Sequence, residues 1–98
     1  MAESAQPAQT MPRDVVLVGK KPIMSYATAA LMQLMDSGAI TIKARGRAIS
    51  RAVDVAQVLE NRLMKGTVKV TDIKIGTEAL GNPPRNVSTI EIKLEKTK

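Results

Sequence analysis

The apolar residues of the chain recur in patterns that predict two helices and four strands. Residues 15–18 are a continuous apolar run, which is typical of a strand covered on both faces. Residues 22–37 carry apolar side chains at helical spacing, and Pro22 suits a first helical turn because a missing N–H costs nothing there. Residues 39–46 alternate between apolar and polar, which predicts a second strand. Strand, helix and strand in succession predict a right-handed βαβ unit with parallel strands.

The second half of the chain predicts another helix and a long hairpin. The helix begins near residues 48–50 and ends near residue 65. Its predicted buried stripe consists of Ile49, Val53, Ala56, Leu59 and Leu63. Residues 67–76 form a third strand whose apolar phase shifts by one residue, so a β-bulge is expected near Thr71 and Asp72. Residues 87–95 form the fourth strand, and the long connection 77–86 predicts a hairpin that extends past the body of a small domain.

The first predicted helix is apolar on two sides. One stripe consists of Ile23, Ala27, Ala30, Leu31 and Leu34. The second contains Met24, Met32 and Met35, and flexible methionines suit packing better than a ligand surface. We therefore expect this helix to pack against the sheet and against a partner.

Length and composition indicate one domain with an ordinary core. The 98 residues divide into an Ala/Gln/Pro/Ser-rich segment at 1–12, predicted to be a flexible tail, and a single domain at 13–98. An apolar content of 44% supports a core without a disulfide or metal. The chain has no Cys and no His, so it lacks the usual zinc ligands and the commonest general base, and we expect no cofactor. The absence of Cys fits a cytoplasmic protein, and without a long apolar run we expect no membrane span.

The positive charge of the chain is concentrated in its first half. Residues 13–51 contain seven Lys/Arg and two acids, so they carry +5 of the net charge of +6. Lys20 and Lys21 follow the first predicted strand. Lys43, Arg45 and Arg47 occupy alternate positions of the second, so we expect all three on one face of the sheet. Together these cations predict a platform for a polyanion, most simply a nucleic-acid backbone.

An enzymatic function finds little support in the sequence. Gly19-Lys20 is not a phosphate-binding P-loop, because Asp14 stands where the first Gly is needed and Lys21 where Ser or Thr is needed. Asp54 and Glu60 have a spacing that explains solubility better than catalysis. We therefore predict a binding protein rather than an enzyme.

Two motifs carry a specific resemblance. GKKP at residues 19–22 and KARGRAISRAVD at residues 43–54, with VVLVGKKPIMSYATAAL and VSTIEI, closely resemble the Alba family of archaeal chromatin proteins. The similarity covers about residues 13–96. It implies an α+β fold with two layers in the order β-α-β-α-β-β and a four-stranded mixed sheet, like the C-terminal domain of translation initiation factor three. It also implies a homodimer that binds double-stranded DNA, and in several members RNA, with little sequence preference.

The resemblance also implies roles for individual residues. Lys20 and Lys21 match lysines that lie on DNA near the dimer axis, and Lys20 matches a lysine that is acetylated in some members to weaken binding. Arg45 and Arg47 match the pair that contacts phosphates. The hairpin matches arms that reach along the minor groove, with Arg85 near the tip. These matches imply a chromosome- or nucleoid-associated protein that compacts DNA and is a substrate of a lysine acetyltransferase and deacetylase.

The sequence differs from some relatives at one position, and three alternatives to the homodimeric DNA-binding protein remain open. Some relatives carry an aromatic residue where Leu63 stands, at a surface through which dimers pack side by side; this chain has no Phe or Trp, which leaves an aliphatic contact there. The first alternative is an RNA-binding subunit of a ribonucleoprotein. The second is a heterodimer with a paralogue. The third is a protein-interaction module whose basic face docks on an acidic partner.

Overall fold

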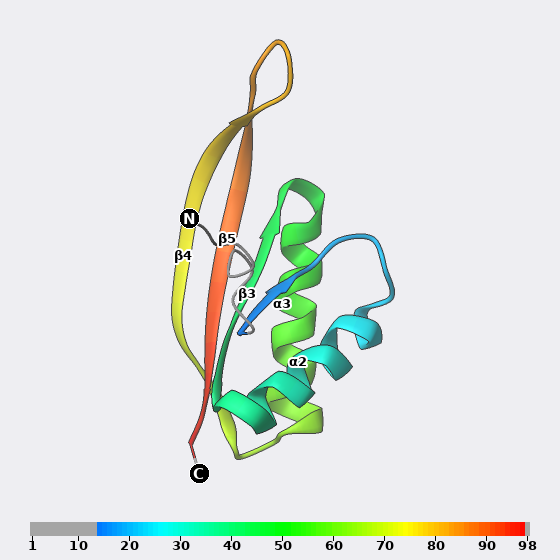
Figure 1. Ribbon diagram of the computed structural model, residues 1–98, viewed down its shortest axis with the longest axis vertical. Coiled ribbons are helices and arrows are strands. Elements are labelled where there is room, and N and C mark those ends of the chain that lie inside the picture. The colour runs from blue at the N-terminus through cyan, green and yellow to red at the C-terminus, as the bar shows by residue number, and fades with distance from the viewer. Residues whose placement is uncertain (1–13, 98) are drawn as a thin grey trace, which may run out of the picture.

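The computed structural model describes residues 14–97 and shows a two-layer α+β fold (Figure 1). The predicted tail at residues 1–12 lies outside the described residues. The four strands are β2 (Val15–Leu17), β3 (Ala39–Arg45), β4 (Val68–Leu80) and β5 (Arg85–Lys96). The two helices are α2 (Ile23–Ser37) and α3 (Ile49–Val58). A 3₁₀ turn, Gly46–Ala48, precedes α3, and a π-helical turn, Leu59–Leu63, extends it.

The sheet has the strand order β2-β3-β5-β4. β2 and β3 are parallel neighbours, and the other two pairs are antiparallel, so the mixed four-stranded sheet is confirmed. Only one face of the sheet is covered, because buried and less buried residues alternate along β3 and β5. Helices α2 and α3 pack on that face (Figure 1).

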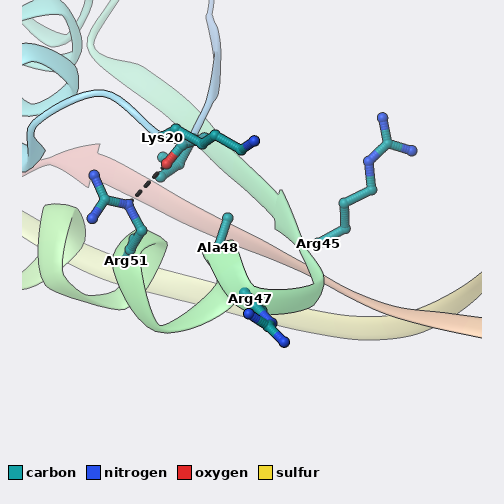
Figure 2. A pocket seen from close by; sticks show the side chains of 7 residues that line it. Lys20, Arg45, Arg47, Ala48 and Arg51 are labelled. Carbon is teal, nitrogen blue, oxygen red and sulfur yellow. Dashed lines mark hydrogen bonds between the residues drawn. The ribbon is translucent and has the colours of Figure 1, made fainter.

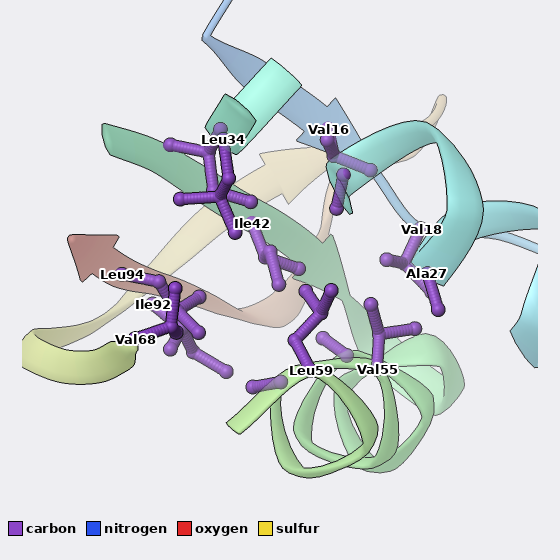
Figure 3. Close-up of a cluster of buried hydrophobic side chains, with 14 of the residues drawn as sticks. Val16, Val18, Ala27, Leu34, Ile42, Val55, Leu59, Val68, Ile92 and Leu94 are labelled. Carbon is purple, nitrogen blue, oxygen red and sulfur yellow. The ribbon is translucent and has the colours of Figure 1, made fainter. Parts of the chain in front are cut away.

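The core forms between this face and the two helices (Figure 3). Helix α2 buries Ala27, Ala30 and Leu34, three members of its predicted stripe, and Ile23 and Leu31 are partly buried. The Met24, Met32 and Met35 side chains are exposed on its other side. Each fully buried Leu, Ile or Val contributes roughly 1.5–3 kcal/mol to folding.

The predicted buried stripe of α3 is partly wrong. The residues that face the sheet are Ala52, Val55, Ala56 and Leu59, which follow the i, i+3, i+4, i+7 spacing of a helix face. Val53 falls beside this face and is 41% exposed. Leu63 is 39% exposed because the last turn is π-helical, with the Met64 N–H donating to Leu59 O, and the wider turn changes the direction of Leu63.

The hairpin of β4 and β5 is longer than predicted, and its connection is shorter. The predicted bulge is confirmed by a shift in register between Val70 and Asp72. Beyond it, pairing continues to Leu80 and Arg85, so residues 77–80 are strand and the turn is only 81–84. Backbone hydrogen bonds between two strands need no core beneath them, which explains why the pairing outruns the apolar pattern. The end of the hairpin projects beyond the helices (Figure 1).

Candidate nucleic-acid interface

The parallel pairing of β2 and β3 brings the two basic clusters together. Both strands end at the same edge of the sheet, so the loop after β2 and the turn after β3 lie side by side. The Val18 N–H donates to Lys43 O at 2.9 Å and extends this pairing toward the loop. A pocket of about 530 Å³ opens between the loop and the turn. Its lining residues are Val18, Gly19, Lys20, Arg45, Arg47, Ala48 and Arg51.

Four of these seven lining residues are cationic. Lys20, Arg45 and Arg47 are exposed, and their side chains spread outward around the pocket rather than into the protein (Figure 2). Lys21 is also exposed and follows Lys20 directly, but it does not line the pocket. Lys20 and the two arginines are more than twenty residues apart in the sequence, and the fold places them around one concave surface.

Arg47 does not lie on the strand face that the sequence predicted. Strand β3 ends at Arg45, and Gly46, with φ at 57°, begins the 3₁₀ turn that contains Arg47. A φ in the left-handed region suits glycine, so the chain leaves the strand here. Figure 2 shows the Arg45 and Arg47 side chains pointing in different directions. The two arginines therefore flank the pocket from two directions instead of forming one row.

The other two predicted cations lie outside this pocket. Lys43 is half-buried and lines a second pocket of about 270 Å³ beside Arg45 and Glu78. There Arg45 Nη1 donates to Glu78 Oε1 at 3.0 Å, so a carboxylate of β4 already pairs with one of the predicted phosphate contacts. Arg85 is exposed at the start of β5, next to the hairpin turn. Arg85 therefore does not line the pocket with Lys20.

Arg51 also lines the pocket, although the sequence analysis gave it no individual role beyond its place in the basic stretch 13–51. It lies in the first turns of α3, four residues after Arg47, and reaches the loop between β2 and α2. Its Nε–H donates to Gly19 O at 2.8 Å, and its Nη2 group donates to Lys21 O (Figure 2 shows the first of these bonds). No local signal identified this role, because Arg47 precedes α3 in the 3₁₀ turn and the carbonyls that Arg51 binds belong to a loop about thirty residues away.

Residues 14–97 contain no cluster of three or more acidic, His or Cys side chains arranged to hold a metal ion. The helices within the same residues are too short or too polar to cross a membrane.

Comparison with known proteins identifies the family. Residues 14–77 match the family model described as Alba. Two relatives are named DNA/RNA-binding protein Alba. The one from Nitrosopumilus maritimus (strain SCM1) is 44% identical over 90 residues, covering 89% of this chain and 95% of the relative. The one from Nanoarchaeum equitans (strain Kin4-M) is 51% identical over 86 residues, covering 83% of this chain and 96% of the relative.

Solved structures agree with this assignment. Alba from Thermoplasma volcanium is similar with a TM-score of 0.77 and 42% identity, covering 83% of this chain and 98% of that one. ALBA1 from Trypanosoma brucei is similar with a TM-score of 0.67 and 28% identity, covering 88% of this chain and 72% of that one. By sequence and by fold, the chain belongs to the Alba family.

Proposed function

We propose that this protein binds nucleic acid through its phosphates, with duplex DNA as the main ligand and with little sequence preference. The observation that carries the proposal is the convergence of Lys20, Arg45 and Arg47 around one pocket. Two relatives of this chain are named as DNA/RNA-binding proteins, which supports the same class of ligand. The role proposed is architectural rather than catalytic.

The cations of this site suit phosphates better than base edges. Lys20 and Lys21 are point charges with rotatable donors, which neutralise phosphate but read no sequence. Arg45 and Arg47 are planar forks that can bind phosphate oxygens bidentately. Helix α2 exposes three methionines and contains no Lys or Arg, so it is unlike a recognition helix of the major groove.

We further propose that the protein acts as a homodimer through the helix side of β4. Ile73 and Ile75 are 57% and 83% exposed there, although they pair across the hairpin with the buried Ile92 and Ile90. Apolar side chains that continue a core into solvent mark an association surface. A second copy would extend the same core over them. The dimer would present two copies of each cation at positions 20, 21, 45 and 47.

The hairpin supplies the outer contact in this proposal. Its end projects beyond the body of the domain (Figure 1), and Arg85 lies at the start of β5, next to the turn. An arginine on such an arm can enter a minor groove and respond to groove width rather than to base sequence. Two arms and one central platform would grip a duplex at several points, and dimers along DNA would compact it.

Acetylation of Lys20 is proposed as a control of this binding. The Lys20 side chain is exposed at the pocket, so a modifying enzyme could reach it. Acetylation removes the charge and with it a phosphate contact. An acetyltransferase and a deacetylase are therefore proposed partners, and the proposed location is the chromosome. Intact-mass measurement of protein from its native source should show a modified lysine, and unmodified protein only would contradict the proposal.

A salt titration tests the phosphate platform. If about six to eight phosphates are neutralised by the dimer, log K should fall with log salt at a slope of roughly −5 to −7. Duplexes of unrelated sequence should give the same slope and similar affinities. A slope near zero would contradict phosphate binding, and strong preference for one sequence would indicate base contacts instead.

RNA is the second candidate ligand, because the relatives are named for both DNA and RNA. A phosphate platform can also accept an A-form helix recognised by its shape. Competition between duplex DNA and structured RNA at one salt concentration distinguishes the two. Preferential displacement of DNA by RNA would favour the RNA-binding role.

A further inference from the structure

We propose that Arg51 and Tyr26 are positioning residues that hold the loop Gly19–Lys21 in the conformation that presents Lys20 and Lys21 to phosphate. The proposal rests on the proposed function for what the loop serves. The ordering of the loop itself is a property of the free protein. These two side chains pair with three backbone groups of the loop, namely Gly19 O, Lys21 O and the Lys21 N–H.

The Arg51 guanidinium bridges the two ends of the loop. Its Nε–H donates to Gly19 O at 2.8 Å, and its Nη2 group donates to Lys21 O. A planar fork fixes the directions of its donors, so it holds two carbonyls at a set separation, which one ammonium group does less well. Arg51 is half-buried, unlike the exposed Arg45 and Arg47, and its donors point at backbone rather than at solvent.

Tyr26 binds the same loop from helix α2. Its hydroxyl oxygen accepts a hydrogen bond from the Lys21 N–H at 3.0 Å. The hydroxyl also lies close to Gly19, where an added Cβ would stand 3.3 Å from the Tyr26 Oη. Glycine at position 19 therefore leaves room for the tyrosine hydroxyl beneath the loop. Two different elements, α2 and α3, thus hold the loop at Gly19 and Lys21.

An ordered loop improves binding by lowering the entropy lost when the lysines meet phosphate. Lysine side chains on a mobile loop must lose backbone and rotamer freedom on binding, whereas a fixed loop has already lost the backbone part. Lys20 points away from Arg51 and over the pocket in this arrangement (Figure 2). Arg51 and Tyr26 would thus raise affinity through the lysines without themselves contacting the ligand.

The test compares variants that differ in charge. Tyr26→Phe removes one hydroxyl and no charge, and Thr28→Val is its control because it removes an exposed hydroxyl from the same helix. Arg51→Gln removes one charge, and Arg62→Gln is its control because it removes the same charge from the exposed turn after α3. Amide hydrogen exchange of the free protein reports loop order, and salt titrations with duplex DNA report affinity and slope.

We expect both loop variants to lose protection of the Lys21 amide and both controls to keep it. Tyr26→Phe should weaken duplex binding by about threefold to tenfold, since one hydrogen bond that orders the loop is lost. The salt slope should stay that of the unaltered protein for Tyr26→Phe and for Arg51→Gln, because the number of phosphate contacts is unchanged.

Two results would overturn the proposal. A Lys21 amide that remains protected in both variants would show that neither side chain orders the loop. A slope reduced by about two in the Arg51→Gln dimer, with unaltered binding by Tyr26→Phe, would make Arg51 a phosphate contact instead. Failure of the proposed function is a separate result, because it would appear as salt-independent binding in the unaltered protein, whatever the amide exchange shows.

Discussion

The body of the domain and its arm, which here means edge strand β4 with the turn 81–84 and Arg85, carry isoleucines on the same sheet face with opposite exposure. Ile92 and Ile90 of β5 are 2% and 8% exposed, because α3 covers them. Their cross-strand partners Ile73 and Ile75 are 57% and 83% exposed, because β4 lies at the sheet edge beyond the helices. The apolar pattern of a strand therefore predicts which face of the sheet is apolar. Whether that face is buried depends on whether a helix packs over it.

The cations of the body and of the arm also differ in how firmly they are held. The body holds the Lys20–Lys21 loop through Arg51 and Tyr26. The arm carries Arg85 exposed at the start of β5, outside the pocket that Lys20 lines. We therefore expect the body to contribute both stability and most of the binding energy, and the arm to contribute association and a smaller share of binding.

The largest expected effect is the loss of a buried isoleucine from the body. Ile92→Ala should lower the free energy of unfolding by about 2–5 kcal/mol, because it removes apolar contacts and leaves a cavity. Urea unfolding followed by circular dichroism measures this change. Ile75→Ala is the matched change on the arm, measured at a protein concentration where the chain is monomeric. Equal losses from the two substitutions would contradict the contrast between body and arm.

Removal of the two loop lysines should have the next largest effect. Lys20→Ala with Lys21→Ala removes four cations from a dimer, which should weaken duplex binding by about a hundredfold to a thousandfold near 0.1 M salt. The loss should be alike for unrelated sequences, as filter binding can show. Arg85→Ala removes only two cations from the arms, so its effect should be smaller. A larger loss from Arg85→Ala would assign the main contact to the arm.

The exposed isoleucines of the arm should control association. Ile73→Thr with Ile75→Thr keeps β-branched residues in the strand but removes apolar surface, so it should weaken self-association by about tenfold to a hundredfold. Sedimentation equilibrium measures this change. Met32→Ser with Met35→Ser is the control on the exposed side of α2. Dissociation by the methionine change alone would place the interface on α2 instead.

The smallest effect should be a gain in affinity. Glu78 of the arm pairs with Arg45 of the body, with both side chains more than half exposed. Glu78→Gln frees Arg45 for phosphate and removes a repelling charge, so duplex binding should strengthen by about twofold to fivefold. Glu95→Gln, which removes the same charge near Lys93, serves as control. Unchanged or weaker binding by Glu78→Gln would show that the pair does not compete with phosphate.

Much of this fold could be predicted because local patterns and tertiary packing agree in the body. The apolar period identified α2 and the strands β2 and β3, and the phase shift after Val70 located the bulge. The errors have physical causes that the pattern does not contain. Val53 is exposed because the face of α3 is centred on Ala52 and Ala56, and the arm continues to Leu80 because backbone pairing needs no apolar alternation.

In the pocket too, the local pattern predicted some features and tertiary contacts determined the others. The alternation of strand residues pointed to Lys43, Arg45 and Arg47 as one row, and the positive φ at Gly46 took Arg47 out of it. Arg51 was part of the basic stretch, but its role depends on backbone carbonyls of a loop thirty residues away, and such contacts leave no local pattern. The pairing of Arg45 with Glu78 likewise depends on the register of the extended arm.

Backbone amide shifts during titration with a duplex test the phosphate platform most directly. The account predicts the largest nuclear magnetic resonance shifts at Gly19, Lys20 and Arg47, with smaller shifts near Arg85. Shifts concentrated at Met32 and Met35 on α2, with Gly19 and Lys20 unmoved, would contradict it.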